Sequence, residues 1–297
     1  MNDAGPHVRK PHASILSQTR KLQRVIALSS QVARGHVGLS GILPVLHRFG
    51  IETVALPTVL LSNHPGHPRS SGQPIEPDLL QTMIATLALN GWLKDIDAVL
   101  IGYLPTVEHV ELAVYMIDQL QHSSHPNFPL VVCDPVIGDD PKGMYVDRHA
   151  AEAIRDLLIK RADLLTPNRF ELEWLAGVRV SDARSAVSAA KQLAPAAVAA
   201  TSIPEANGLI SNVYMESGDG WRLHPCSIPR LEAVPNGTGD VFSALLLANL
   251  LSGYLSHPEV ALERSSLALR QIVEASSGRD ELDLIGTADV WMAATIA

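Results

Sequence analysis

Short apolar segments alternate with helical patterns along most of this 297-residue chain, and this alternation restricts the fold more than any other feature. A strand that is apolar on both faces belongs in a parallel sheet, because helices must cover both of its sides. We therefore expect an α/β fold with a central, mostly parallel sheet and helices on both faces. The expected strands are residues 25–30, 53–59, 98–101, 130–133, 163–166 and 197–201.

The segments between these strands have the spacing of amphipathic helices. Gly50 and the pair Asn90-Gly91 are typical stop signals and end two of them. The expected helices are residues 39–49, 78–90, 107–120, 148–160, a segment from about 169, 182–193, 240–251 and 258–275, of which the last two close the fold.

The pattern changes near residue 209. Residues 209–215 and 221–224 flank Ser217-Gly-Asp-Gly220, and an Asp-Gly pair favours a tight turn between antiparallel strands. We expect an antiparallel hairpin there, at the edge of the sheet. The sequence shows no internal repeat and no linker-like composition, so we expect residues 24–297 to form a single domain after a flexible tail of residues 1–23.

Composition excludes several classes of partner. The formal net charge of −8 argues against nucleic acid, whose binding needs clustered Lys and Arg. The longest apolar stretch, residues 241–255, is shorter than the roughly 20 residues that span a bilayer. The two cysteines, Cys133 and Cys226, form neither a disulfide framework nor a zinc site and fit a reducing compartment. We expect a soluble, cytoplasmic protein.

The segment Pro235–Ala244 is the most informative for chemistry. Its glycines, Gly237 and Gly239, let the backbone approach a ligand closely, and the first amides of the helix that follows have no intrahelical partner. Such amides form an anion site. Asp240 at the helix start fits a base that takes a proton from an attacking hydroxyl while the amides hold a phosphoryl group. The alternative is an Asn-Gly turn with Asp240 as an ordinary helix cap.

Two other expected strands also end in polar residues. Asp134 follows one buried strand, and Asn168 and Glu171 follow the next, three residues apart and so on one face of a helical turn. Ligands of open α/β sheets bind at the carboxyl ends of the strands, so these side chains are candidates for a Mg²⁺ site, mostly through water. The alternative is a capping box formed by Asn168 and Glu171, and both interpretations can hold together.

The longest irregular stretch, residues 63–77, is rich in Pro and Gly and follows a strand. A long loop in that position is either an active-site cover or a plain surface connection. His64 lies in it, while Ser30 and Tyr103 lie at other strand ends; each is a weak signal by itself.

These segments together resemble a known family. Gly-Thr-Gly-Asp240 is similar to the G-x-G-D signature of ribokinase-like kinases. Ser30 with Gly-His-Val-Gly38, Ser-Asn-His64, Gly-Tyr103, Cys-Asp-Pro135 and Thr-Pro-Asn-Arg-Phe-Glu171, in this order before Gly-Thr-Gly-Asp240, resemble the pyridoxal kinases among them. The similarity covers roughly residues 25–275 and implies a ribokinase-like fold.

The resemblance implies transfer of the γ-phosphoryl group of ATP to the 5′-hydroxyl of pyridoxal, in vitamin B6 salvage. Asp240 would be the base, and the amides of Gly237, Thr238 and Gly239 the anion hole. Asp134 and Glu171 would organise Mg²⁺ through water. The substrate side would comprise Ser30, His64, Pro65, Gly66, Tyr103, Cys133 and Asp240. The ATP side would comprise Asp134, Thr166, Asn168, Glu171, Thr201, Ser202, Pro225, Cys226, Ser227 and Ile228.

Relatives of this kind are usually homodimers and often use a monovalent cation such as K⁺. One departure is Pro65, which stands where many relatives have Thr and puts loop closure in question. A thiol adds reversibly to an aldehyde, so Cys133 is either a residue that forms an adduct with pyridoxal or an inert core cysteine.

Two other functions stay open. One is a kinase for a related hydroxymethyl heterocycle such as the thiamine pyrimidine, or for a sugar or nucleoside, in the same fold. The other is a non-catalytic protein that binds B6 vitamers, although Asp240 is retained.

Overall fold

The computed structural model describes residues 22–296 except 123–127, 194, 218–220 and 232–233. The expected tail of residues 1–23 therefore lies outside the described residues, apart from Leu22 and Gln23. The expected turn Ser217–Gly220 is likewise described only at Ser217.

Nine strands form the main sheet in the described part of the chain, in the order β11-β10-β9-β8-β5-β4-β1-β2-β3. The six central strands, from β9 to β2, run parallel, as the apolar alternation predicts. The bounds are β1 Arg24–Val32, β2 Glu52–Leu61, β3 Gly72–Pro74, β4 Ala98–Ile101, β5 Leu130–Cys133, β8 Leu164–Leu165, β9 Ala197–Pro204, β10 Leu209–Glu216 and β11 Arg222–Pro229.

Both edges of the sheet are antiparallel. The expected hairpin is confirmed by β10 and β11, and β10 also pairs antiparallel with β9. At the other edge, β3 pairs with Val59–Leu61 of β2. Strand β3 lies inside residues 63–77, the stretch expected to be a loop. With three exposed residues that include Gly72 and Pro74, β3 has no apolar pattern by which to predict it.

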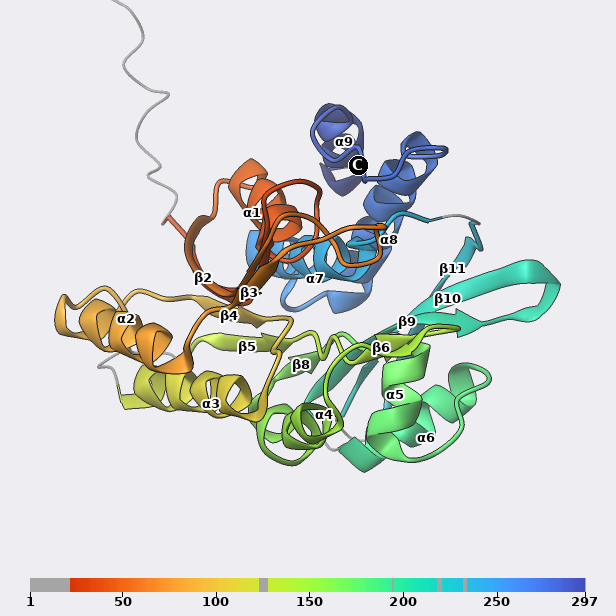
Figure 1. The fold of residues 1–297 in the computed structure, drawn as a ribbon. Coiled ribbons are helices and arrows are strands. Elements are labelled where there is room, and N and C mark those ends of the chain that lie inside the picture. The colour runs from red at the N-terminus through yellow and green to blue at the C-terminus, as the bar shows by residue number, and fades with distance from the viewer. Residues whose placement is uncertain (1–21, 123–127, 194, 218–220, 232–233, 297) are drawn as a thin grey trace, which may run out of the picture.

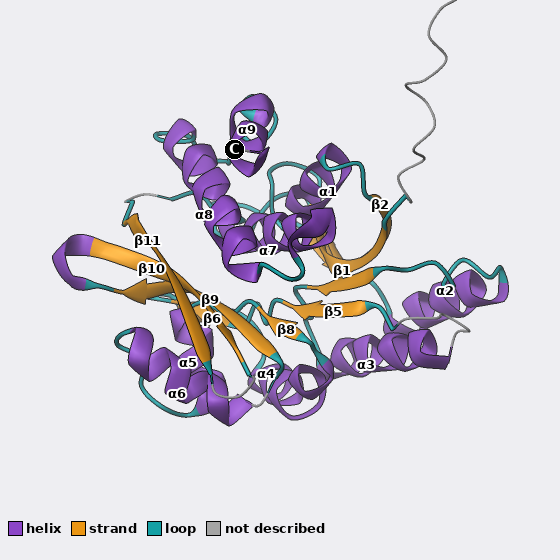
Figure 2. Ribbon diagram, turned by 180° about the vertical axis from the view of Figure 1, so that it is seen from behind, coloured by secondary structure: helices purple, strands orange, loops and turns teal. Residues whose placement is uncertain are grey.

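Helices cover both faces, as Figures 1 and 2 show. Alternate side chains of each strand point to opposite faces, so Ile26 and Leu28 join one buried cluster while Val25 and Ala27 join the other. One layer holds α2 Pro77–Leu89, α3 Val107–His122, α4 Arg148–Ala153, α5 Arg169–Ala176 and α6 Ala183–Leu193; the other holds α1 Leu39–Arg48, α7 Thr238–Asn249, α8 Pro258–Ala275 and α9 Ala288–Ile296.

The helices differ from expectation in three places. The helix expected at 148–160 is α4 followed by a π-helical turn, Ile154–Leu158, and a 3₁₀ turn. The helix expected from 240 begins at Thr238, so Asp240 is its third residue. The chain does not close on two helices, because α9 follows; its sequence is apolar almost throughout and has little helical periodicity.

Parallel strands point the same way, so the residues that follow β1, β2, β4, β5, β8 and β9 gather at one edge of the sheet. A small hairpin stands at this edge, formed by β6 Gly138–Asp139 and β7 Gly143–Met144. Among the described residues, no helix is long and apolar enough to cross a membrane.

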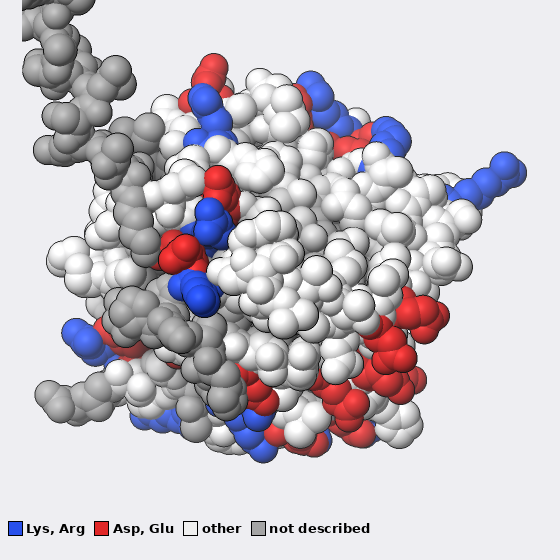
Figure 3. Space-filling view, turned by 90° about the vertical axis from the view of Figure 1, so that its left-hand side faces the viewer, with Lys and Arg blue, Asp and Glu red and all other residues white. Residues whose placement is uncertain are grey.

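The side of the molecule that carries α2 and β2 is poor in charge (Figure 3). Charged side chains are sparse across much of this view. Five large apolar side chains on β2, α2 and the turn after α2 are exposed by more than a third: Leu60, Leu79, Met83, Leu89 and Trp92. A face of this kind is typical of a contact with another protein surface.

Candidate active site

The glycine turn before α7 touches the loop that follows β1. Gly237 has a φ of 96°, and a Cβ atom at this position would lie 2.0 Å from the carbonyl oxygen of His36. Only glycine fits both the backbone conformation and the space. The turn therefore holds the first amides of α7 beside the β1–α1 connection; we call residues 237–239 the glycine cradle.

Asp240 lies at the cradle and is 9% exposed. The N-cap of α7 is Gly237, so the alternative that Asp240 is the helix cap is wrong. Its carboxylate accepts hydrogen bonds from the amide of Gly38 and from its own amide, while burial raises its pKa to about 6. Gly38 in turn forms a β-bridge with Gln31, next to Ser30, so the end of β1 positions the carboxylate.

Asp134 is buried at the end of β5 and borders the cradle. A Cβ atom at Gly239 would lie 3.7 Å from Asp134 Oδ2. This oxygen accepts a hydrogen bond from Ser243 Oγ at 2.9 Å, and Ser243 Oγ lies 2.7 Å from Thr166 Oγ1. Burial, followed by the charges of Glu171 and Asp240, holds the pKa of Asp134 well above its usual range.

Asn168 and Glu171 form the capping box at the start of α5. Glu171 does more than cap, because its Oε1 also accepts hydrogen bonds from the amides of Ile137 at 2.8 Å and Gly138 at 3.3 Å. Asn168 Nδ2 donates to the carbonyl oxygen of Gly138 at 2.7 Å. Burial raises the pKa of Glu171 to about 7. Both side chains thus hold the β6–β7 hairpin at the site; we call Asp134, Glu171 and Asp240 the acidic cluster.

The loop after β2 reaches the same edge. Gly66 donates its amide to His64 Nδ1 at 3.0 Å, and a Cβ atom at Gly66 would lie 3.4 Å from Asn236 Nδ2. Burial, and next the charge of Lys142, lowers the pKa of His64. A neutral imidazole that accepts at Nδ1 carries its hydrogen on Nε2 and can donate it to a ligand. This position favours the interpretation of the loop as a cover; Pro65 beside it is exposed.

Three residues on the expected substrate side are less accessible than the loop: Ser30, which is 6% exposed, Tyr103 and Cys133. Tyr103 packs partly against the core, and its amide donates to Ser29 Oγ at 3.1 Å. Cys133 is fully buried in the core cluster, and burial raises the pKa of its thiol. A buried neutral thiol favours the inert alternative over the adduct.

The expected nucleotide residues extend along the edge from the acidic cluster. Thr201 forms a parallel bridge with Asn168, and Ser202 has a φ of 59° with its amide donating to Asn212 Oδ1. Residues 225–228 lie on β11, four strands from β5. At about 4.8 Å per strand, roughly 20 Å separate them from Asp134. They are therefore not part of the acidic cluster.

Four residues at this edge were not predicted from the sequence: Lys142, Tyr145, Asn236 and Ser243. Lys142 Nζ lies 3.4 Å from Asn236 Oδ1, and the hydroxyl of Tyr145 contacts Asp139. The helical spacing of Ser243 from Asp240 was an available signal, because residues three apart share a face. The contacts of Lys142 and Tyr145 arise only from the fold of the hairpin.

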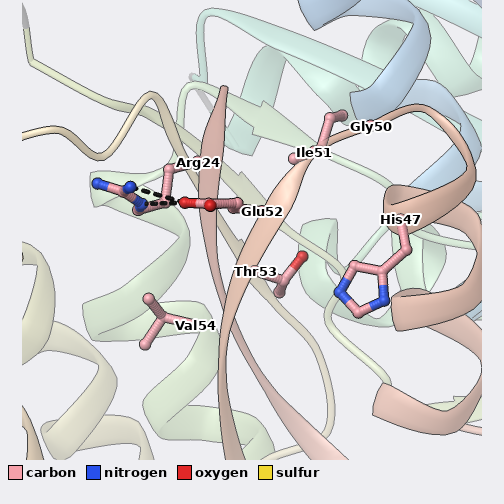
Figure 4. Close-up of a pocket in the computed structure, with 7 residues that line it drawn as sticks. All are labelled: Arg24, His47, Gly50, Ile51, Glu52, Thr53 and Val54. Carbon is pink, nitrogen blue, oxygen red and sulfur yellow. Dashed lines mark hydrogen bonds and ion pairs between the residues drawn. The ribbon is translucent and has the colours of Figure 1, made fainter. Parts of the chain in front are cut away.

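A surface hollow lies at the opposite end of the strands (Figure 4). It is lined by Arg24, His47, Gly50, Ile51, Glu52, Thr53 and Val54, at the amino ends of β1 and β2. Arg24 Nη2 pairs with Glu52 Oε2 at 2.6 Å. Its ionisable groups are the Arg24–Glu52 ion pair and the His47 imidazole, without the converging buried acids of the other end, so we place the chemistry at the carboxyl edge.

Comparisons with known proteins agree with this geometry. The family model described as phosphomethylpyrimidine kinase matches residues 47–278. A protein of Bordetella avium named pyridoxine/pyridoxal/pyridoxamine kinase is 35% identical over 264 residues, which are 88% of each chain. This chain belongs to the pyridoxal kinase family.

Solved pyridoxal kinases have the same ribokinase-like architecture. The enzyme from Entamoeba histolytica superposes with a TM-score of 0.85 at 26% identity, over 92% of this chain and 96% of its own. Pyridoxal kinase from Leishmania donovani, in complex with ADP and pyridoxine, gives a TM-score of 0.83 at 27% identity, over 91% and 95%. The expected fold class is confirmed.

Proposed function

We propose that this member of the pyridoxal kinase family transfers the γ-phosphoryl group of ATP to the 5′-hydroxyl of pyridoxal. The observation that carries the proposal is the buried Asp240 carboxylate, held at the glycine cradle on the ligand-binding edge of the sheet. The complex of a relative with ADP and pyridoxine supports both co-substrates.

In this proposal Asp240 is the general base. The hydroxyl proton of the vitamer passes to its carboxylate, the hydroxyl oxygen forms a bond to the γ-phosphorus, and the bond from that phosphorus to ADP breaks. With a pKa of about 6, Asp240 is ionised at neutral pH and still basic enough to take the proton. The hydrogen bond from Gly38 fixes the carboxylate in place.

The cradle amides are the anion hole of the proposal. The amides of Gly237, Thr238 and Gly239 stand before the first intrahelical bond of α7, at the positive end of the helix dipole. They hold the transferring phosphoryl group without reorganising, which is how such sites stabilise developing charge.

The residues present fit a magnesium ion that is held mainly by ATP and water. The described residues contain no group of three or more His, Cys, Asp or Glu arranged to hold a metal directly. Asp134 and Glu171 would orient its water ligands. Both oxygens of Glu171 already accept hydrogen bonds from backbone amides, which favours contact with the ion through water over direct ligation. When bound, Mg²⁺ supplies positive charge to the phosphates and keeps several waters, as it usually does. We infer from the family resemblance that the reaction also uses a monovalent cation such as K⁺.

Substrate contacts divide between two groups of strand ends. Ser30, His64 and Tyr103, at the ends of β1, β2 and β4, would contact the vitamer, and residues 63–66 would cover it. Thr201 and Ser202 with Pro225, Cys226, Ser227 and Ile228 would contact the nucleotide. The length of ATP accounts for the distance between β11 and the acidic cluster.

A second candidate is phosphorylation of the thiamine pyrimidine, because the matching family model is that of phosphomethylpyrimidine kinase. A non-catalytic vitamer-binding protein is disfavoured, since it has no need for a buried carboxylate of raised pKa at a cradle.

The exposed apolar side chains on the face around α2 and β2 support a homodimer. The mass of the particle in solution, by light scattering, tests this assembly. A cytoplasmic location stays a prediction from composition.

Purified protein with ATP and Mg²⁺, offered pyridoxal, pyridoxine, pyridoxamine and the thiamine pyrimidine separately, tests the activity. We expect ADP formation with the B6 vitamers and the 5′-phosphate as product, identified by mass. Turnover of the thiamine pyrimidine alone would replace the first proposal by the second, and turnover of none would overturn both.

A further inference from the structure

The β6–β7 hairpin carries a lysine to the mouth of the glycine cradle. Its base is held firmly by Glu171 and Asn168, through the amides of Ile137 and Gly138 and the carbonyl of Gly138. Its turn holds Lys142, whose side chain is 57% exposed. The hairpin therefore has a fixed base beside the acidic cluster and a solvated cation at its tip.

Lys142 makes two loose contacts. Its Nζ lies 3.4 Å from Oδ1 of Asn236, the residue before Gly237, and 3.7 Å from Oδ2 of Asp139. Both distances exceed those of strong charge-assisted hydrogen bonds. An ammonium held this loosely is free to exchange its partner for a better anion.

The charges around the cradle call for such a cation. Asp134, Glu171 and Asp240 are buried together, and a triphosphate would bring further negative charge. Two arginines near this edge are already engaged, Arg169 with Asp140 and Glu173, and Arg34 with Asp280 and Glu281. Lys142 is paired only weakly. The charge of Lys142 also contributes to lowering the pKa of His64.

We propose that Lys142 is a phosphate-binding residue of the kinase reaction. When ATP binds, the Lys142 ammonium moves from Asn236 to the terminal phosphate. The inference rests on the proposed function and extends it. Lys142 compensates the negative charge of Asp134 and Glu171, and it does so from a hairpin that Glu171 helps to hold. The alternative is that Lys142 only ties the hairpin tip to Asn236.

The test compares Lys142→Met and Lys142→Arg with Lys94→Met, a change at an exposed lysine after α2. Binding of ADP and of the non-hydrolysable β,γ-imido analogue of ATP is measured by titration calorimetry with Mg²⁺. Loss of a charged contact to the terminal phosphate should weaken the ATP analogue about tenfold or more and ADP about threefold or less. Lys142→Arg should retain most of the affinity, and Lys94→Met all of it.

A second readout is the His64 pKa, followed by NMR in the same variants. Lys142→Met should raise it, because the ammonium now lowers it. Equal losses of affinity for the ATP analogue and ADP, or no loss, would overturn the inference whatever the His64 pKa does. If Lys142→Met weakens the ATP analogue more than ADP but the wild-type protein phosphorylates no B6 vitamer, the phosphate-binding role of Lys142 is retained and the proposed substrate is rejected. If it phosphorylates vitamers and Lys142→Met binds the analogue as tightly as wild type, only Lys142 falls.

Discussion

The two ends of the parallel strands differ in what they hold. At the amino ends of β1 and β2, an open hollow is lined by residues that include an exposed Arg24–Glu52 ion pair, His47 and Thr53. At the carboxyl ends, three buried carboxylates meet a glycine turn and the start of α7. Surface ion pairs contribute little, whereas buried acids with raised pKa values are costly to keep. The comparison teaches that converging buried charge marks the reacting end better than an open hollow does.

The largest expected effect belongs to Asp240→Asn. Loss of the base should lower kcat by about a thousandfold, within the usual range for general bases, while ATP binding changes little. Asp289→Asn is the matched control, since Asp289 also lies in the first turn of a helix, α9, but its side chain is far more exposed than that of Asp240. Rates of ADP formation in a coupled assay distinguish the two variants. If Asp240→Asn keeps full activity, as the control does, the assignment of catalysis to the carboxyl ends of the strands is wrong.

Glu171→Gln separates charge from capping at the same end. Glutamine preserves a capping box, so a role in capping alone would leave activity intact. We expect kcat to fall by roughly tenfold or more and more Mg²⁺ to be needed for half-maximal rate, because the water ligands lose an anionic acceptor. Glu173→Gln, on the same helix but outside the cluster, should behave like wild type. Equal Mg²⁺ curves for the two variants would argue that Glu171 only caps α5.

Burial of Asp240 should also be visible in stability. Its folded pKa of about 6 lies above the ordinary aspartate value of 3.8, so its contribution to stability is fully present below about pH 3.8 and is lost as pH rises through about 6. Asp240→Asn removes this loss, and at pH 8 it should stabilise the protein by up to about 3 kcal/mol. Urea unfolding at pH 8 and at pH 4 checks this, with the gain confined to the higher pH. A variant that is less stable at pH 8 would contradict the assigned burial.

The smallest effect is expected at the amino end. Thr53 Oγ1 is buried without a hydrogen-bond partner among the described residues, and valine replaces it with the same shape. Thr53→Val should leave kcat/KM unchanged and should raise the free energy of unfolding by about 1 kcal/mol or less. A clear loss of activity in steady-state assays would show that the hollow takes part in function and would remove the contrast.

Much of this account could be predicted from the sequence, for a physical reason. Apolar runs such as Val25–Leu28 identify buried parallel strands, and parallel strands place Asp134 and Asn168 at one edge wherever the helices lie. Contacts made by loops in space have no such signal. The approach of Lys142 to Asn236 depends on how Glu171 holds the β6–β7 hairpin, whose strands are only two residues long. Helix α9, in turn, lacks the periodicity that reveals a helix.

The central claim is that Asp240 takes the proton from the vitamer hydroxyl at the glycine cradle. The most direct measurement is the single-turnover rate of phosphoryl transfer from ATP to pyridoxal as a function of pH. The claim predicts a rate that rises about tenfold per pH unit and levels off near pH 6, with this limb absent in Asp240→Asn. A limb that persists unchanged in the variant would contradict it.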